Sequence, residues 1–86
     1  MSSEIRVDLY LFARLRETCG GRPRLSMRVP GGATPETCFE QLREQFPGLG
    51  AQRRGLAVAV NEEYADWDRA LSDGDEVSFI PPVSGG

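Results

Sequence analysis

Residues 5–12 alternate, with aliphatic side chains at every second position and Arg6, Asp8, Tyr10 and Phe12 between them. A period of two is typical of a strand with one face in the core, so we predict a strand here. Tyr10 and Phe12 then lie on the opposite face, where Phe12 is exposed unless another surface covers it. The apolar positions of this strand are Ile5, Val7, Leu9 and Leu11.

A second alternating segment spans residues 24–29 and predicts another strand, which forms a hairpin with the first through a long connection. Residues 13–19 within that connection suit a short helix. The Gly-Gly pair at 20–21 ends this helix, because glycine adopts the left-handed conformation that helix C-termini prefer.

The longest helical pattern starts at residue 34. Thr34 suits the N-cap, Pro35 the first helical position and Glu36 the positive end of the helix dipole. Apolar residues then recur at helical spacing until the Pro-Gly pair at 47–48 ends the helix. We expect Cys38 to be a small buried hydrophobe rather than a reactive thiol. The apolar stripe consists of Cys38, Phe39, Leu42 and Phe46.

Three apolar segments follow in the second half of the chain. Residues 56–60 are continuously apolar, which predicts a strand buried on both faces. Residues 64–66 suit a short edge strand, and residues 76–80 suit a final strand that follows a strong turn signal at 72–75. Trp67 is expected to pack as a satellite of the core.

The resulting order is strand, strand, helix, strand, short strand, strand. It predicts an α+β domain over residues 1–80, with one main helix on one face of a mixed sheet of about five strands. In such a layout the last strand can pair parallel to the first and lie centrally, as it does in a β-grasp fold.

Residues 81–86 are predicted to form a projecting tail. Pro81 and Pro82 lack the N–H that a central strand needs, so they turn the chain off the sheet. Gly85 and Gly86 have no side chains, so this backbone can approach another protein closely. The carboxylate of Gly86 is the candidate reactive group, and an ordinary frayed end is the alternative. The tail is Pro81, Pro82, Val83, Ser84, Gly85 and Gly86.

The composition narrows the chemistry. The 86 residues suit one small domain, and neither a signal peptide nor a membrane span is recognisable, so we expect a cytoplasmic protein with no membrane partner. Histidine is absent and the two cysteines, Cys19 and Cys38, form no C-x-x-C pair, which argues against a metal site and a self-contained hydrolase. The absence of lysine excludes Schiff-base chemistry.

Charge is unevenly distributed along the chain. Residues 1–54 contain nine arginines and six acidic residues, whereas residues 55–86 contain one arginine and seven acidic residues. The acidic second half argues against nucleic acid as a partner and is compatible with docking onto a basic protein surface. Arg53 and Arg54, in an expected loop at 48–55, suit a solvated loop or, alternatively, a basic pair that binds a partner.

Four segments together resemble the MoaD family, the small subunits of molybdopterin synthase. They are residues 12–17 (FARLRE), 58–61 (VAVN), 71–77 (LSDGDEV) and 79–86 (FIPPVSGG). The resemblance covers nearly the whole chain. It implies a ubiquitin-like β-grasp fold and a sulfur carrier with no catalytic residues of its own.

In that family, an E1-like activating enzyme of the MoeB type uses ATP to adenylate the terminal carboxylate, here that of Gly86. Sulfur from a donor such as a cysteine desulfurase or a rhodanese then replaces AMP and gives a thiocarboxylate. The tail enters the large subunit, MoaE, which contains the catalytic residues and builds the molybdopterin dithiolene. The resemblance therefore implies no permanently bound cofactor and no metal.

The resemblance also implies a docking surface. Phe12, Tyr64 and Ile80 match apolar docking positions of the family. Arg16 matches an arginine typical of the family, for which an acidic residue of the activating enzyme is one expected partner. The alternatives are edge-strand packing for Tyr64 and an ordinary surface ion pair for Arg16. Residues 73–75 (DGD) are interpreted as turn chemistry.

Two other functions stay open. The chain can be a carrier that delivers sulfur to thiamin, cysteine or another pathway, or that is conjugated to proteins. It can also be a β-grasp interaction module whose tail is inert.

Overall fold

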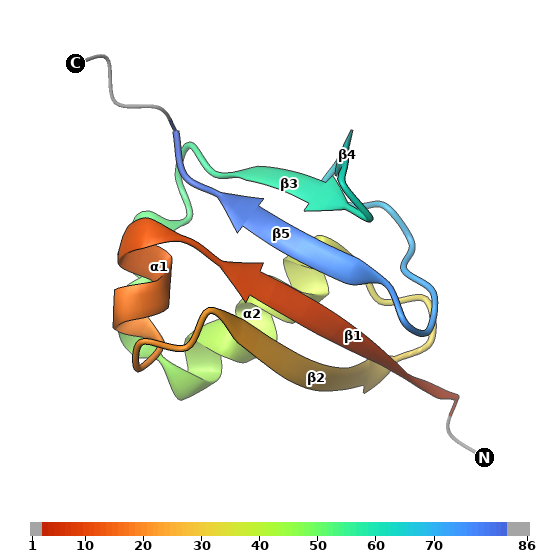
Figure 1. Cartoon of the computed structure of the whole chain (residues 1–86). Helices are drawn as coiled ribbons and strands as arrows, with labels where there is room; N and C mark the ends of the chain where they lie inside the picture. Colours follow the sequence, from red (N-terminus) through yellow and green to blue (C-terminus); the bar gives the residue numbers. More distant parts are fainter. Residues whose placement is uncertain (1–2, 83–86) are drawn as a thin grey trace.

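The computed structural model describes residues 3–82, apart from the side chain of residue 51. Five strands form one sheet in the order β2-β1-β5-β3-β4, and one long helix crosses one of its faces (Figure 1). The predicted α+β layout with a mixed sheet is confirmed. The elements are β1 (Glu4–Leu11), α1 (Ala13–Thr18), β2 (Arg24–Pro30), α2 (Pro35–Gln45), the 3-10 helix η1 (Pro47–Gln52), β3 (Ala57–Val60), β4 (Glu63–Ala65) and β5 (Glu76–Ile80).

The centre of the sheet is a parallel pair of strands from the two ends of the described chain. β1 and β5 run in the same direction, with Leu9 opposite Val77 and Leu11 opposite Phe79. β2 pairs with β1 antiparallel, and β3 pairs with β5 antiparallel. Because β1 and β5 are parallel, α1 and the segment that follows β5 leave the sheet at the same end (Figure 1).

The start of α2 is determined locally by two threonines. The Thr34 side chain accepts a hydrogen bond from the Thr37 N–H, and the Thr37 hydroxyl accepts one from the Thr34 N–H, both at 3.2 Å. This reciprocal capping box satisfies two backbone donors that the first helical turn leaves without partners. Pro35 follows at the first helical position. The predicted N-cap is confirmed.

The core lies between α2 and the face of the sheet that α2 covers. Trp67 packs against this core: its ring stacks on Phe79 at 5.6 Å between centroids and meets Phe39 edge-to-face at 5.7 Å. Its predicted satellite role is confirmed. The largest fully buried side chains are Phe39, Phe79, Leu9, Leu11, Leu15, Leu42, Leu49, Val7, Val29, Val58, Val60 and Val77.

Two expectations need correction in the second half of the chain. Residues 48–55 are not a plain loop, because Pro47–Gln52 forms a 3-10 helix held to the core by the fully buried Leu49. Arg53 is not a freely solvated residue either, since its guanidinium stacks on Trp67 and pairs with Glu36.

In the region that the structure describes, none of the helices is both long and apolar enough to cross a membrane.

Candidate functional site

The last strand prepares the root of the predicted tail. β5 ends at Ile80, and Pro81, which cannot donate to a strand ladder, is the next residue. Pro81 is half-buried and Pro82 is exposed. The other predicted tail residues, Val83, Ser84, Gly85 and Gly86, lie outside the described residues.

β5 presents different side chains to the two faces of the sheet. Val77 and Phe79 are buried against the core. Ser78 and Ile80, which alternate with them, point to the opposite face, away from α2. The strand that leads into the tail therefore contributes both to the core and to the open face.

A shallow apolar hollow of about 340 Å³ lies on this open face. Phe12 is 46% exposed and Tyr64 is 79% exposed, and they are the two exposed large hydrophobic side chains among residues 3–82. Three of the predicted docking residues are thus brought together around one depression, which we call the apolar hollow. Its lining residues are Phe12, Ala59, Glu62, Tyr64, Ser78 and Ile80.

Strand register explains why the hollow exists. Ala59 of β3 lies opposite Tyr64 of β4 on one side and opposite Ser78 of β5 on the other. Two small side chains therefore form the floor between the larger Tyr64 and Ile80. Sequence reasoning missed Ala59, Ser78 and Glu62, because only the cross-strand pairing places them beside the predicted residues.

Arg16 lies apart from the apolar hollow, on α1. Its side chain is exposed and forms no ion pair with any residue between 3 and 82. Its carbonyl oxygen accepts hydrogen bonds from the N–H groups of Cys19 and Gly21 and so helps to end α1. The expected surface ion pair is not formed within the described chain, and the role of Arg16 in docking stays a prediction.

The Asp73-Gly74-Asp75 segment forms a turn at the other end of β5. Asp75 Oδ2 accepts from the Ser72 N–H at 2.8 Å, and Asp73 Oδ1 accepts from the Arg6 N–H at 2.8 Å. Gly74 has φ +88°, a conformation that strongly favours glycine. The interpretation as turn chemistry is confirmed.

Neither cysteine is placed to act as a nucleophile. Cys19 and Cys38 are free and fully buried. Burial raises the pKa of the Cys38 thiol to about 11 and also raises the pKa of Cys19. Because the thiolate is the reactive form, both thiols are inert at neutral pH. The expectation that Cys38 is a small buried hydrophobe is confirmed.

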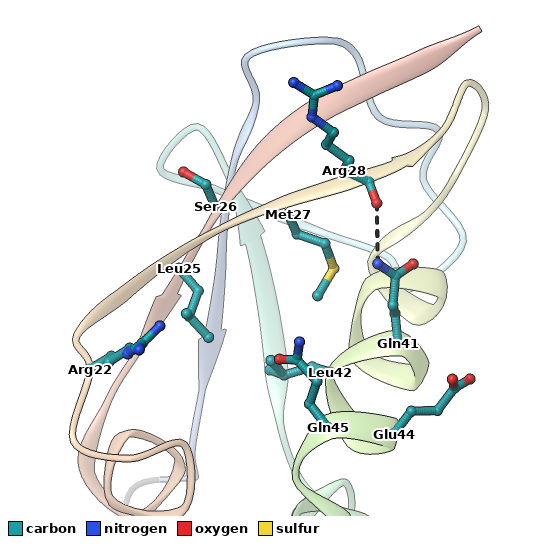
Figure 2. A pocket seen from close by; sticks show the side chains of 9 residues that line it. All are labelled: Arg22, Leu25, Ser26, Met27, Arg28, Gln41, Leu42, Glu44 and Gln45. Carbon is teal, nitrogen blue, oxygen red and sulfur yellow. Dashed lines mark hydrogen bonds between the residues drawn. The ribbon is translucent and has the colours of Figure 1, made fainter. Parts of the chain in front are cut away.

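A larger hollow, of about 660 Å³, lies elsewhere, between β2 and α2 (Figure 2). Met27 and Leu42 form part of its wall, and the Gln41 side chain donates to the Arg28 carbonyl oxygen at 3.1 Å across it. This bond satisfies one acceptor on the edge strand. The groove is a feature of the edge of the sheet and shares no lining residue with the apolar hollow.

A five-stranded sheet with this strand order and one helix across it is the β-grasp fold of ubiquitin-like proteins, and here it carries an apolar hollow beside the root of a C-terminal segment. The chain belongs to the ThiS family, whose model matches residues 9–86.

Relatives support this assignment over nearly the full length. A molybdopterin synthase sulfur carrier subunit from Arabidopsis thaliana is 38% identical over 85 residues, which cover 99% of this chain and 88% of the relative. A protein of the same name from Mycobacterium tuberculosis is 37% identical over 82 residues, covering 95% and 99%. Among solved structures, small archaeal modifier protein 1 from Haloferax volcanii superposes with a TM-score of 0.83 at 28% identity, over 92% of this chain and 99% of that one.

Proposed function

We propose that this chain is the sulfur carrier subunit of a molybdopterin synthase, and that the carboxylate of Gly86 carries the sulfur as a thiocarboxylate. The observation that supports the proposal best is the near full-length similarity to proteins of that name, together with a family match that includes the Gly-Gly end. The proposed partner is a MoaE-like large subunit, which supplies the catalytic residues.

Activation is chemically necessary because a carboxylate oxygen is a poor leaving group. In the proposed route, the Gly86 carboxylate attacks the α-phosphorus of ATP on an E1-like enzyme, and pyrophosphate leaves. A persulfide from the sulfur donor then attacks the acyl carbon. The bond between this carbon and the phosphate oxygen breaks, and AMP leaves. The product is an acyl disulfide between Gly86 and the sulfur donor. A second thiol attacks the donor's sulfur in this S–S bond and forms a disulfide with the donor, which leaves the other sulfur on Gly86 as the thiocarboxylate. ATP is a substrate of the activating enzyme and is not held by this chain.

The apolar hollow is the proposed docking site for the large subunit. An exposed aromatic pair on a rigid sheet is the kind of anchor that dominates protein interfaces. Once the folded domain is docked, a tethered tail reaches its target at a high effective concentration. Phe12, Tyr64 and Ile80 are the proposed anchors.

The charging reaction tests the proposal directly. We expect incubation with an E1-like enzyme, ATP and a sulfur donor to replace one Gly86 oxygen by sulfur, which intact-protein mass spectrometry detects. A variant that lacks Gly86 should keep the melting temperature of the parent chain and show no mass gain. If the parent chain gains no sulfur under conditions that charge a known carrier, the proposal is wrong.

The docking site needs a separate measurement. We expect Tyr64→Ser and Phe12→Ser each to weaken binding to a MoaE-like subunit by about 30-fold, the effect of losing a hot-spot residue of about 2 kcal/mol. Arg69→Ser, on an exposed residue that does not line the hollow, is the control. If Tyr64→Ser and Phe12→Ser bind as tightly as the Arg69→Ser control and the parent chain, the hollow is not part of the interface.

A second candidate function is a carrier for another pathway, or a modifier conjugated to proteins. The superposition on small archaeal modifier protein 1 favours it. An affinity capture that recovers a thiazole synthase, or covalent conjugates of this chain, instead of a MoaE-like subunit would decide for it. In either carrier role, a residue appended after Gly86 should abolish charging, whereas a module with an inert tail would tolerate that residue.

A further inference from the structure

A third depression, of about 490 Å³, lies at the root of the tail. Its walls come from α1, from the end of η1 and the segment that joins η1 to β3, and from the two prolines that follow β5. These segments meet because β1 and β5 are parallel and finish at the same end of the sheet (Figure 1). The lining residues are Ala13, Arg14, Leu15, Gln52, Arg54, Leu56, Pro81 and Pro82.

Two arginines line this depression. Arg14 and Arg54 are both exposed, and neither forms an ion pair with a residue in the range 3–82. The depression contains no acidic residue to offset them. They are therefore two solvated positive charges beside the root of the tail, and we call them the arginine collar.

The collar is one pole of an uneven charge distribution. Residues 13–24, which form α1 and its exit at the same end of the sheet, contain four arginines and one acidic residue, Glu17. Acidic residues gather at the opposite end, where β5 begins and β3 turns into β4, because Val60 pairs with Val77 there. The acidic residues of these turns are Glu62, Glu63, Asp73, Asp75 and Glu76.

The wall that carries Arg54 is packed against the tail root. Gly55 has φ +82°, and a Cβ at this position would lie 3.4 Å from the Pro82 ring. The Gly55 backbone therefore lies beside Pro82, which places the neighbouring Arg54 next to the point where the tail starts. Ala13, at φ +51°, makes the matching sharp turn from β1 into α1 that leads to Arg14.

We propose that the arginine collar docks against acidic side chains at the entrance of the site that receives the tail on the activating enzyme. This inference rests on the proposed carrier function. The four residues after Pro82 span at most about 13 Å, so a protein that acts on Gly86 has to bring its entrance close to Arg14 and Arg54. The Debye length is about 8 Å at physiological ionic strength and about 30 Å at 0.01 M salt, so charge at the entrance acts on the collar most strongly when the salt concentration is low.

A protein is the better match than a nucleic acid. The collar end has an excess of positive charge in a chain whose net charge is −3, whereas Arg6 and Arg28 at the other end lie beside the acidic turn at Asp73, so a polyanion that extends along the sheet meets acidic residues. Opposite charges on the entrance would orient the domain so that the tail arrives first. Their main effect is therefore expected on the rate of association.

The test compares charging rates of three double variants with that of the parent chain. Arg14→Glu/Arg54→Glu reverses the collar, and Arg14→Lys/Arg54→Lys keeps its charge. Arg28→Glu/Arg69→Glu changes the net charge by the same amount on exposed residues that do not line the tail-root depression. Thiocarboxylate formation is followed by mass spectrometry with the activating enzyme far below saturation, at low and at high salt.

We expect the collar reversal to slow charging by about tenfold at low ionic strength and by less than about twofold at high salt, because salt screens steering charges. The lysine variant and the Arg28/Arg69 variant should stay within about twofold of the parent chain. A collar reversal that charges at the parent rate in low salt, or a control that slows as much, overturns the inference and leaves the carrier function intact. Absence of charging in the parent chain overturns both.

Discussion

Replacing Arg53 by alanine should destabilise the domain although the residue lies near the surface. The Arg53 guanidinium carbon is 3.4 Å from the centroid of the Trp67 ring, and its Nη2 donates to Glu36 Oε1 at 2.7 Å. The side chain thus closes the aromatic cluster of Trp67, Phe39 and Phe79 on its outer side. Its loss exposes the Trp67 ring and removes two interactions at once.

The magnitude follows from these two contacts. A cation–π contact of this kind stabilises by about 0.5–2 kcal/mol, and a partly exposed ion pair by about 0.2–1 kcal/mol. We therefore expect Arg53→Ala to lower the free energy of unfolding by about 1.5 kcal/mol. For a domain of this size, each kcal/mol corresponds to a fall in melting temperature of about 4–8 °C.

Chemical denaturation followed by Trp67 fluorescence measures the effect, because Trp67 is the sole tryptophan. Arg54→Ala is the matched control: the neighbouring arginine is exposed and has no ion-pair partner in residues 3–82, so its change should stay within about 0.5 kcal/mol. Glu36→Gln, which removes only the ion pair, should cost less than about 1 kcal/mol. If Arg53→Ala is as stable as Arg54→Ala, the stacked arginine contributes nothing and the reasoning is refuted.

Two further predictions concern α2. Thr34→Ala removes the N-cap and should lower the free energy of unfolding by about 1 kcal/mol, whereas Thr34→Ser keeps a hydroxyl and should retain most of the stability. If circular dichroism shows an unchanged melting temperature for Thr34→Ala, the capping geometry is contradicted. The Cys38 thiol keeps a pKa of about 11 in the fold against an ordinary value of 9.0, so above pH 9 it ionises in the unfolded chain first. The free energy of unfolding should consequently fall between pH 9 and 11, and this one group contributes up to about 1.4 kcal/mol per pH unit. Urea titrations at several pH values should show a shallower fall for Cys38→Ala than for the parent chain.

The features that the sequence predicted well are encoded locally. Alternation identified β1 and β2, and the Thr34-Pro35 start identified α2, because both signals depend on neighbours within one element. The central parallel pairing of β1 and β5 was expected from the layout and from the family resemblance, and the register confirms it.

The features that were missed depend on residues far apart in the sequence. Arg53 meets Trp67 and Glu36 only after η1 returns the chain to the aromatic cluster, so the arginine pair gave no local sign of this role. The floor of the apolar hollow is formed by Ala59 and Ser78, whose small size matters only because strand pairing places them side by side. No periodicity within one segment reports such contacts.

The two faces of β5 should allow stability and the proposed docking to be altered independently. Val77 and Phe79 anchor the strand in the core, whereas Ser78 and Ile80 belong to the open face on which the apolar hollow lies, and the tail starts one residue later. β5 is the central strand of the five, with two strands on each side, so the tail root follows directly from the middle of the sheet. In the proposed carrier role, this separation lets partners bind the open face beside the tail, while the side chains that hold β5 in the core face the other side of the sheet.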